Sequence, residues 1–207
     1  MNTVQVSFDY PERLSRGILL LKTFLGFIIL IPHLIALFAL GIAAGLVMFI
    51  SWFAVLFTGK YPQSLFDFEV GVQDWGLRVS AYMGLLRDEY PVFGLEARYP
   101  SRFQVHYPDK LSRGILLLRL FFGWIYVMIP HGVCLLFRGI AYLAVTFVAW
   151  WAVLFTGKMP RRMFNFLAGT LRWNQNLNAY LMFLTDEYPP FTGKENGSGS
   201  AGTGFIA

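Results

Sequence analysis

Apolar residues fill two long stretches of the chain, and few polar residues interrupt either one. Between Gly17 and Phe57 the main interruptions are Lys22, His33 and Ser51. A membrane-spanning helix needs about 20 residues, so each stretch is long enough for two spans with a short connection. We predict four spanning helices, paired as two hairpins, over residues 15–39, 43–58, 112–137 and 141–156.

The turn within each hairpin is predicted from glycine and from charge. In the first stretch it falls near Gly41–Gly45, and Arg138-Gly139 occupies the matching place in the second. A charge in the middle of a span costs about 3 kcal/mol on insertion scales, whereas a charge at a turn reaches water. Pro32 and Pro130 fall inside the first helix of each hairpin, where each removes a backbone donor and should kink the helix.

A weaker apolar segment follows each hairpin, over residues 64–86 and 162–184. Its apolar residues recur at alternating spacings of three and four, which indicates one face of a helix. The opposite face of the first segment carries Asp67, Glu69, Asp74 and Arg78. We therefore predict two amphipathic helices that lie in the membrane–water interface and do not cross the bilayer.

Alternating apolar and polar residues precede each hairpin, from Val4 to Phe8 and from Phe103 to Tyr107. This alternation predicts two short, equivalent β-strands. A lone pair of strands is only marginally stable in water. We therefore expect the strands to pack on the amphipathic helices.

The second half of the chain repeats the first. Leu14 to Leu21 recurs unchanged as Leu111 to Leu118, and after Gly26 and Gly123 the second copy carries one additional residue. The chain is thus a tandem duplication, with repeat 1 over 1–98 and repeat 2 over 99–192. The Gly, Ser and Ala content of 193–207 predicts a flexible tail. The predicted fold class is an all-α integral membrane protein with short strands before each hairpin.

Composition narrows the class of protein. Hydrophobic residues make up 56% of the chain and charged residues 14%, whereas soluble domains carry about 25% charge. A soluble globular domain and a disordered chain are both excluded. The net charge is +5, and the basic residues flank the apolar stretches, so anionic lipid is the expected counter-surface and nucleic acid is not. The single cysteine, Cys134, excludes an internal disulfide and a cysteine-ligated metal cluster.

Aromatic and basic residues set the expected depth and orientation. Lys22 and Arg119 lie inside the span ends, where their long stems reach the headgroups. Three spans per repeat would leave many basic residues outside, against the positive-inside tendency, whereas two spans leave only Arg138 there. We predict a multi-pass protein of the bacterial inner membrane, with both termini cytoplasmic and its copies related by a two-fold axis along the membrane normal. The predicted interfacial anchors are Trp52, Trp75, Trp150, Trp151 and Trp173.

The repeated motifs resemble those of a known family. Each copy carries Tyr-Pro-x-x-Leu-Ser-Arg, then Ile-Pro-His, Phe-Thr-Gly-Lys-x-Pro and Asp-Glu-Tyr-Pro. This combination is similar to the bacterial membrane proteins grouped as domain of unknown function 4389, here in two tandem copies. The resemblance covers nearly the whole chain, and it implies no activity.

His33 and His131 are the main candidates for chemistry, because each follows a proline in a predicted span and ionisable groups inside membranes are functional candidates. Three roles are open. The two could meet across the two-fold axis and ligate haem or a chlorophyll-type pigment axially, or they could conduct protons or ions. Each could also pack and hydrogen-bond in the polar gap that its proline leaves. The last role is favoured, so no cofactor is expected.

Two pairs of carboxylates, Asp88-Glu89 and Asp186-Glu187, lie near the C-termini of the two predicted amphipathic helices. They could serve as acid and base, but negative charge is disfavoured at a helix C-terminus, so cationic partners are expected. Thr-Gly-Lys at 58–60 and 156–158 lacks the rest of a phosphate loop and is interpreted as a helix stop. We predict that the carboxylates form structural ion pairs with Arg13, Arg16, Lys110 and Arg113.

These patterns favour a non-enzymatic protein, acting as an accessory or scaffold subunit of a larger membrane complex. Its expected partners are anionic lipid and other membrane proteins. A small oligomeric channel or transporter that uses His33 and His131 is one alternative, and a carrier of a haem or chlorophyll-type cofactor is another. No catalytic residue and no metal site is predicted.

Overall fold

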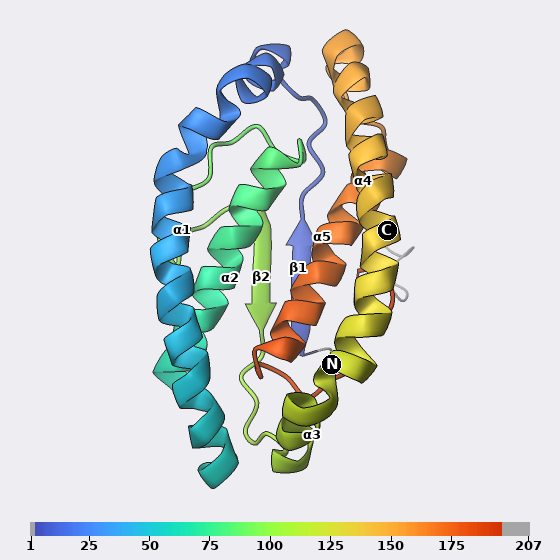
Figure 1. Ribbon diagram of the computed structural model, residues 1–207. Coiled ribbons are helices and arrows are strands. Elements are labelled where there is room, and N and C mark those ends of the chain that lie inside the picture. The colour runs from blue at the N-terminus through green and yellow to red at the C-terminus, as the bar shows by residue number, and fades with distance from the viewer. Residues whose placement is uncertain (1–2, 196–207) are drawn as a thin grey trace, which may run out of the picture.

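Long outer helices enclose shorter helices and a small sheet in the computed structural model, which describes residues 3–195. α1 and α4 lie on the outside, and α2, α5 and the sheet lie between them (Figure 1). The part of the predicted tail from residue 196 onward lies outside the described residues. The elements in chain order are β1 (Val4–Phe8), α1 (Arg16–Thr58), α2 (Gln63–Met83), β2 (Ser101–Val105), α3 (Arg113–Gly123), η1 (Trp124–Met128), α4 (Ile129–Thr156) and α5 (Arg161–Leu181).

α1 is a single helix where the sequence predicts a hairpin. It runs unbroken for 43 residues, and it is bowed along its length (Figure 1). The predicted turn near Gly41–Gly45 is wrong, because both glycines stay helical and face open space. Its buried residues fall on one face from end to end: Leu19, Gly26, Leu30, His33, Ala44, Ser51 and Val55.

The second long helix is also continuous, from Arg113 to Thr156. Its middle segment, η1, is a π-helix, and it lies where the second copy carries its additional residue. A π-turn accommodates one extra residue without ending the helix. The insertion therefore leaves α3 and α4 as parts of one continuous helix.

Arg138 lies inside this helix and not at a turn. Its Nε donates to Thr170 Oγ1 of α5 at 2.9 Å, so the charge finds an acceptor within the protein and needs no turn to reach water. The predicted turn at Arg138-Gly139 is therefore wrong. The four-span arrangement fails with the two turns, since a continuous helix crosses a bilayer at most once.

The sheet joins the two copies through antiparallel pairing of β1 and β2. Val6 lies opposite Phe103, and both are buried in the main core, which provides the support that a lone pair of strands needs. Asp74 Oδ1 of α2 accepts a hydrogen bond from Phe103 N at 2.7 Å, and Arg172 Nε of α5 donates to Val6 O at 2.9 Å. β1 has its predicted bounds, and β2 begins two residues before its predicted start.

The ends of the long helices are joined across the copies. At joint 1, where α1 begins and α4 ends, Leu14 N donates to Gly157 O and Arg16 Nη2 to Phe155 O, both at 2.8 Å. Each joint places an arginine at the carbonyl end of the other copy's helix, where positive charge is favoured. The equivalent bonds of joint 2, where α1 ends and α3 begins, run from Leu111 N to Gly59 O at 2.8 Å and from Arg113 Nη2 to Phe57 O at 2.7 Å.

Gly59 and Gly157 end the long helices in the left-handed conformation, with φ of 73° and 69°. This conformation favours glycine over any residue with a side chain. The helix-stop interpretation of the two Thr-Gly-Lys segments is therefore confirmed.

The joints and the sheet define an approximate two-fold axis. β1 pairs antiparallel with β2, and the end of each long helix meets the start of the other. Equivalent elements thus run in opposite directions, which places the axis perpendicular to the long helices.

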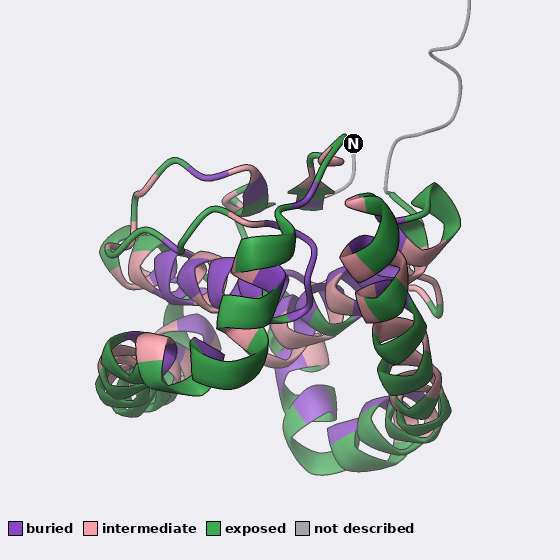
Figure 2. Ribbon diagram, turned by 90° about the horizontal axis from the view of Figure 1, so that it is seen from above, coloured by how far each residue is buried: buried purple, intermediate pink, exposed green. Residues whose placement is uncertain are grey.

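Two helices, Arg16–Thr58 and Arg113–Thr156, are long and apolar enough to cross a membrane. Only 11% and 6% of their most apolar windows are buried within the protein, so neither resembles the core helix of a soluble domain. Figure 2 shows exposed residues along α1 and α4 and buried residues on the helices between them.

Candidate functional site

His33 lies in an enclosure of aromatic side chains from its own copy. Its side chain is fully buried, and its Nδ1 accepts a hydrogen bond from Trp75 Nε1 of α2 at 2.9 Å. The ring of Phe93 stacks on the imidazole at 3.8 Å between centroids, and Tyr90 meets it at a steeper angle at 5.0 Å. The Pro-His motif of α1 and the Tyr-Pro-x-Phe segment after α2 thus form one site.

The second copy builds the same enclosure. Trp173 Nε1 donates to His131 Nδ1 at 2.9 Å, and Phe191 stacks on that imidazole at 3.9 Å. Tyr188 completes it with a ring-centroid distance of 5.4 Å. Each histidine is therefore surrounded by its own repeat, and within residues 3–195 no ring contact joins one enclosure to the other.

The hydrogen bond from tryptophan fixes the tautomer of each imidazole. An indole N–H only donates, so Nδ1 of His33 and of His131 is the acceptor and the ring proton of the neutral form is on Nε2. Nε2 of each ring is buried without a partner in hydrogen-bonding geometry. A protonated nitrogen offers no lone pair to a metal, so axial ligation would require the proton to leave Nε2.

A tyrosine hydroxyl hydrogen-bonds the helix turn before each proline. A proline leaves the carbonyl four residues earlier without its usual donor, which is Ile28 O for Pro32 and Tyr126 O for Pro130. The Tyr90 hydroxyl donates to Ile29 O at 2.9 Å, and the Tyr188 hydroxyl donates to Tyr126 O at 2.8 Å. Each histidine is packed and hydrogen-bonded, as its favoured role expects, but its partner is the neighbouring indole and not a carbonyl of the preceding turn.

The first carboxylate of each acidic pair caps the start of its own long helix. Asp88 Oδ2 accepts from Ser15 N at 2.5 Å, and Asp186 Oδ2 accepts from Ser112 N at 2.6 Å. Negative charge is favoured at a helix N-terminus. These contacts connect the segments after α2 and α5 to the starts of α1 and α3.

The cations beside these carboxylates are not the predicted ones. Lys22 Nζ lies 3.6 Å from Asp88, and Arg119 Nη2 lies 3.1 Å from Asp186. Both point inward from the long helices, so they pair within the protein and do not snorkel to headgroups. Among the predicted partners, Arg16 and Arg113 bind the carbonyls of the joints, and Arg13 and Lys110 have exposed side chains.

The second carboxylate of each pair binds elsewhere. Glu89 forms an ion pair with Arg87 at 3.1 Å, and Glu187 accepts a hydrogen bond from Thr3 N at 3.2 Å. The two members of each pair therefore have separate partners, which is not the arrangement of a cooperating acid and base.

The predicted tryptophan anchors divide into two groups. Trp75 and Trp173 are buried and bound to the histidines, so their prediction as anchors toward the acyl chains is wrong. Trp151 is exposed on α4. Trp150 Nε1 donates to Thr23 Oγ1 of α1 at 2.8 Å near joint 1, and Trp52 is half-buried.

The two enclosures fall in two stretches of sequence that match one family. Residues 21–94 and 116–193 match the family described as Domain of unknown function (DUF4389). The chain belongs to this family. Each matched stretch contains one complete DUF4389 enclosure, from the histidine through the tryptophan to the tyrosine. Comparisons with curated proteins and with solved structures find no match.

The two DUF4389 units differ at several buried positions, and one of them, Glu69, has a burial that its place on the polar face of an amphipathic helix does not predict. Glu69 of α2 is fully buried, and neither carboxylate oxygen has a partner in hydrogen-bonding geometry. Burial raises the pKa of Glu69 to about 7, against a smaller opposing effect of Gln73. The signal was available in the comparison of the copies, where Ser51, Tyr61 and Glu69 of the first become Ala149, Met159 and Leu167 of the second.

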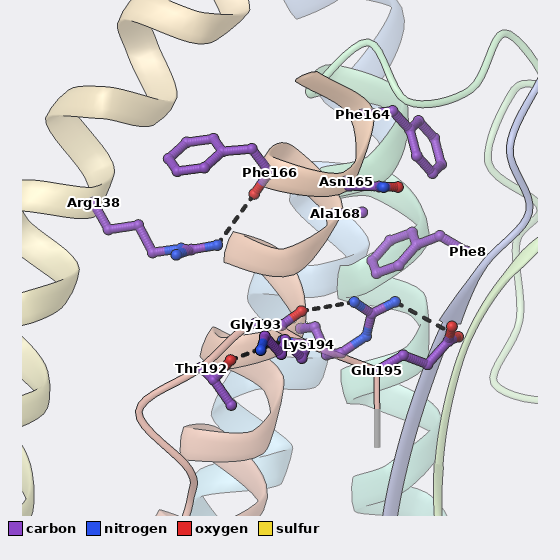
Figure 3. Close-up of a pocket in the computed structure, with 11 residues that line it drawn as sticks. Phe8, Arg138, Phe164, Asn165, Phe166, Ala168, Thr192, Gly193, Lys194 and Glu195 are labelled. Atoms are coloured by element: carbon purple, nitrogen blue, oxygen red, sulfur yellow. Dashed lines mark hydrogen bonds and ion pairs between the residues drawn. The ribbon is translucent and has the colours of Figure 1, made fainter. Parts of the chain in front are cut away.

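The second DUF4389 unit has a polar cavity of about 530 Å³ beside α5. Figure 3 shows Arg138 reaching toward Phe166 O from α4, and residues Thr192 to Glu195, which also line the cavity, lying beside α5. Arg172 Nη1 donates to Gly193 O at 2.8 Å and forms an ion pair with Glu195 at 3.7 Å. Protein acceptors therefore bind both guanidinium groups. Among residues 3–195, no group of three or more His, Cys, Asp or Glu side chains is placed to hold a metal ion.

Proposed function

We propose that this protein is a non-enzymatic scaffold of the bacterial inner membrane, acting as an accessory subunit of a larger membrane complex. The observation that carries the proposal is the use of the motifs that occur in both copies. Leu-Ser-Arg and Thr-Gly-Lys build the joints, and Asp-Glu caps the long helices. Pro-His and Tyr-Pro build the aromatic enclosures. The duplication has thus retained a framework.

The outer faces of the long helices support the choice of a membrane setting. Phe24, Phe38 and Phe57 of α1 are 77%, 73% and 71% exposed. A monomer with such an apolar surface would aggregate in water. Lipid and other apolar helices are the partners that cover it. We place both termini in the cytoplasm, because exposed basic residues gather at the joints and the cytoplasmic leaflet carries the negative surface potential.

Purification from native membranes tests the proposal. The protein is extracted into copolymer nanodiscs after chemical cross-linking, and the co-purifying chains are identified by mass spectrometry. We expect specific membrane proteins in a fixed ratio to the 23.6 kDa chain. Recovery of the chain alone, with or without copies of itself, would overturn the scaffold proposal.

A matched variant separates structural from chemical use of the histidines. His33→Asn retains an acceptor near the position of Nδ1 for Trp75, but it removes the titratable ring. The scaffold proposal expects the same set of partners from this variant as from the wild type. Loss of those partners from a variant that is still folded would point to chemistry at His33.

A further inference from the structure

The proposed membrane setting leaves open how the protein sits in the bilayer, and the geometry of the long helices decides this. We infer that the protein is monotopic: both long helices lie along the membrane plane within one leaflet of anionic phospholipid, and neither crosses the bilayer. The inference rests on the proposed membrane setting and not on the proposed partners.

The length of the apolar surface is the first argument. Exposed apolar side chains on α1 begin at Leu20 and continue to Phe57, a distance of about 57 Å at 1.5 Å per residue. The hydrocarbon core is about 30 Å thick. An upright helix would leave nearly half of this apolar surface in water, whereas a helix lying in the membrane plane keeps all of it in lipid.

The position of the sheet is the second argument. β1 precedes α1 in the chain and β2 follows it, yet the two strands pair directly. The sheet lies midway along the long helices (Figure 1). In an upright molecule it would lie at the depth of the bilayer centre, with the exposed side chains of Gln5, Arg102 and Gln104 in hydrocarbon. Open sheet edges and unpaired polar groups do not occur there.

The layering of the molecule is the third argument. Seen along the long helices, the sheet lies on one side and α1 and α4 lie toward the other, with α2 and α5 between (Figure 2). A helix is about 10–12 Å across, so a single layer of helices fits within one leaflet of about 15 Å. The polar layer then faces water, and the two-fold axis coincides with the membrane normal. Both copies therefore have the same relation to lipid and to water.

Charge at the ends of the apolar face supports the choice of an anionic leaflet. At joint 2 the exposed basic residues are Lys60, Lys110 and Arg113. A lipid headgroup layer that meets both ends of α1 encounters positive charge at each, and basic residues near an anionic surface strengthen binding to it. The exposed basic residues at joint 1 are Arg13, Arg16, Lys158, Arg161 and Arg162.

Labelling from either side of the membrane tests the inference. Single cysteines replace Glu12 and Lys60, the exposed residues just before and just after α1, in a Cys134→Ser background. An impermeant maleimide is applied to spheroplasts and to inverted vesicles. We expect both positions to react in the same preparation, and the control Gln104→Cys on the sheet to react with them. Reaction of Glu12→Cys and Lys60→Cys from opposite sides would overturn the inference.

The same experiment separates this inference from the proposed function. Labelling of both positions in inverted vesicles supports both the in-plane arrangement and the cytoplasmic side. Labelling of both only in spheroplasts supports the in-plane arrangement and overturns the cytoplasmic placement. Neither result depends on whether other subunits co-purify.

Depth measurements provide a second test on the purified protein. Spin labels at Phe24, Phe38 and Phe57, in vesicles of phosphatidylethanolamine and phosphatidylglycerol, are probed with oxygen and with a polar nickel complex. We expect all three at depths within one leaflet. A label at Phe38 at the bilayer centre, with the other two near opposite surfaces, would overturn the inference.

Discussion

Replacement of Glu69 should remove a large part of the pH dependence of stability. Burial raises the pKa of this carboxyl from 4.5 to about 7. Between these values the folded protein keeps the proton on Glu69 while the unfolded chain releases it, so unfolding becomes more favourable as pH rises. Each pH unit in this range changes the free energy of unfolding by about 1.4 kcal/mol. The wild type should lose about 3 kcal/mol from pH 4.5 to pH 7 through Glu69 alone.

The measurement is thermal and denaturant-induced unfolding in a mild detergent, followed by tryptophan fluorescence at intervals of half a pH unit. Glu69→Gln should flatten the dependence below pH 7, and Glu69→Leu, which introduces the residue found at position 167, should do the same. Other carboxyls, such as the half-buried Asp74, titrate in all variants, so the difference from wild type isolates Glu69. The exposed residue Glu96 provides the control Glu96→Gln, which should keep the wild-type slope.

One result would refute this reasoning. It is a Glu69→Gln variant with the wild-type slope between pH 5 and pH 7, which would mean that water solvates the carboxyl in the folded protein.

Three further predictions concern the joints and the enclosures. Arg113→Gln should lower the free energy of unfolding by about 1 kcal/mol, because the end of α1 loses a cationic donor, and protection of Phe57 and Thr58 from hydrogen exchange should fall; unchanged protection would contradict the assignment. His131→Phe should destabilise by about 1–3 kcal/mol by leaving the Trp173 N–H without an acceptor, and His131→Asn should recover much of this in the same unfolding assay. Tyr188→Phe should cost about 1 kcal/mol and increase exchange around η1; an equal effect at the distant β1 would argue for a global cause.

Local sequence patterns predict the strands and the shorter helices, but they wrongly predict a turn inside each long helix. The length of the apolar stretch predicts two spans, and glycine at 41 and 45 together with Arg138-Gly139 in the second copy indicates a turn between them. In an apolar surround glycine stays helical, because the backbone has no competing partner for its hydrogen bonds. A better signal was present: Lys22, His33 and Ser51 fall on a single helical face, which requires one unbroken helix.

The candidate site could be predicted only in part, because local patterns identify its histidines but not their partners. His33 was found because it interrupts an apolar stretch, but its contact with Trp75 depends on how α2 returns along α1, which no local pattern encodes. The joint arginines were assigned to the acidic pairs because both lie near the same ends. Their acceptors, such as Phe57 O, are backbone carbonyls of the other copy. Every residue has such a carbonyl, so the amino-acid sequence does not show which one is bound.

Joint 1 has a consequence for the order of events during synthesis. Leu14 belongs to the start of the first copy and Gly157 to the second half of the second copy, so the ribosome makes the first long before the second. The first copy therefore emerges with Ser15 N capped by its own Asp88 but with Leu14 N and Arg16 without their acceptors at joint 1. Closing so long a loop costs little more free energy than closing one of half its length. Joint 1 therefore forms late because its second half is synthesised late, and not because the long loop is costly to close.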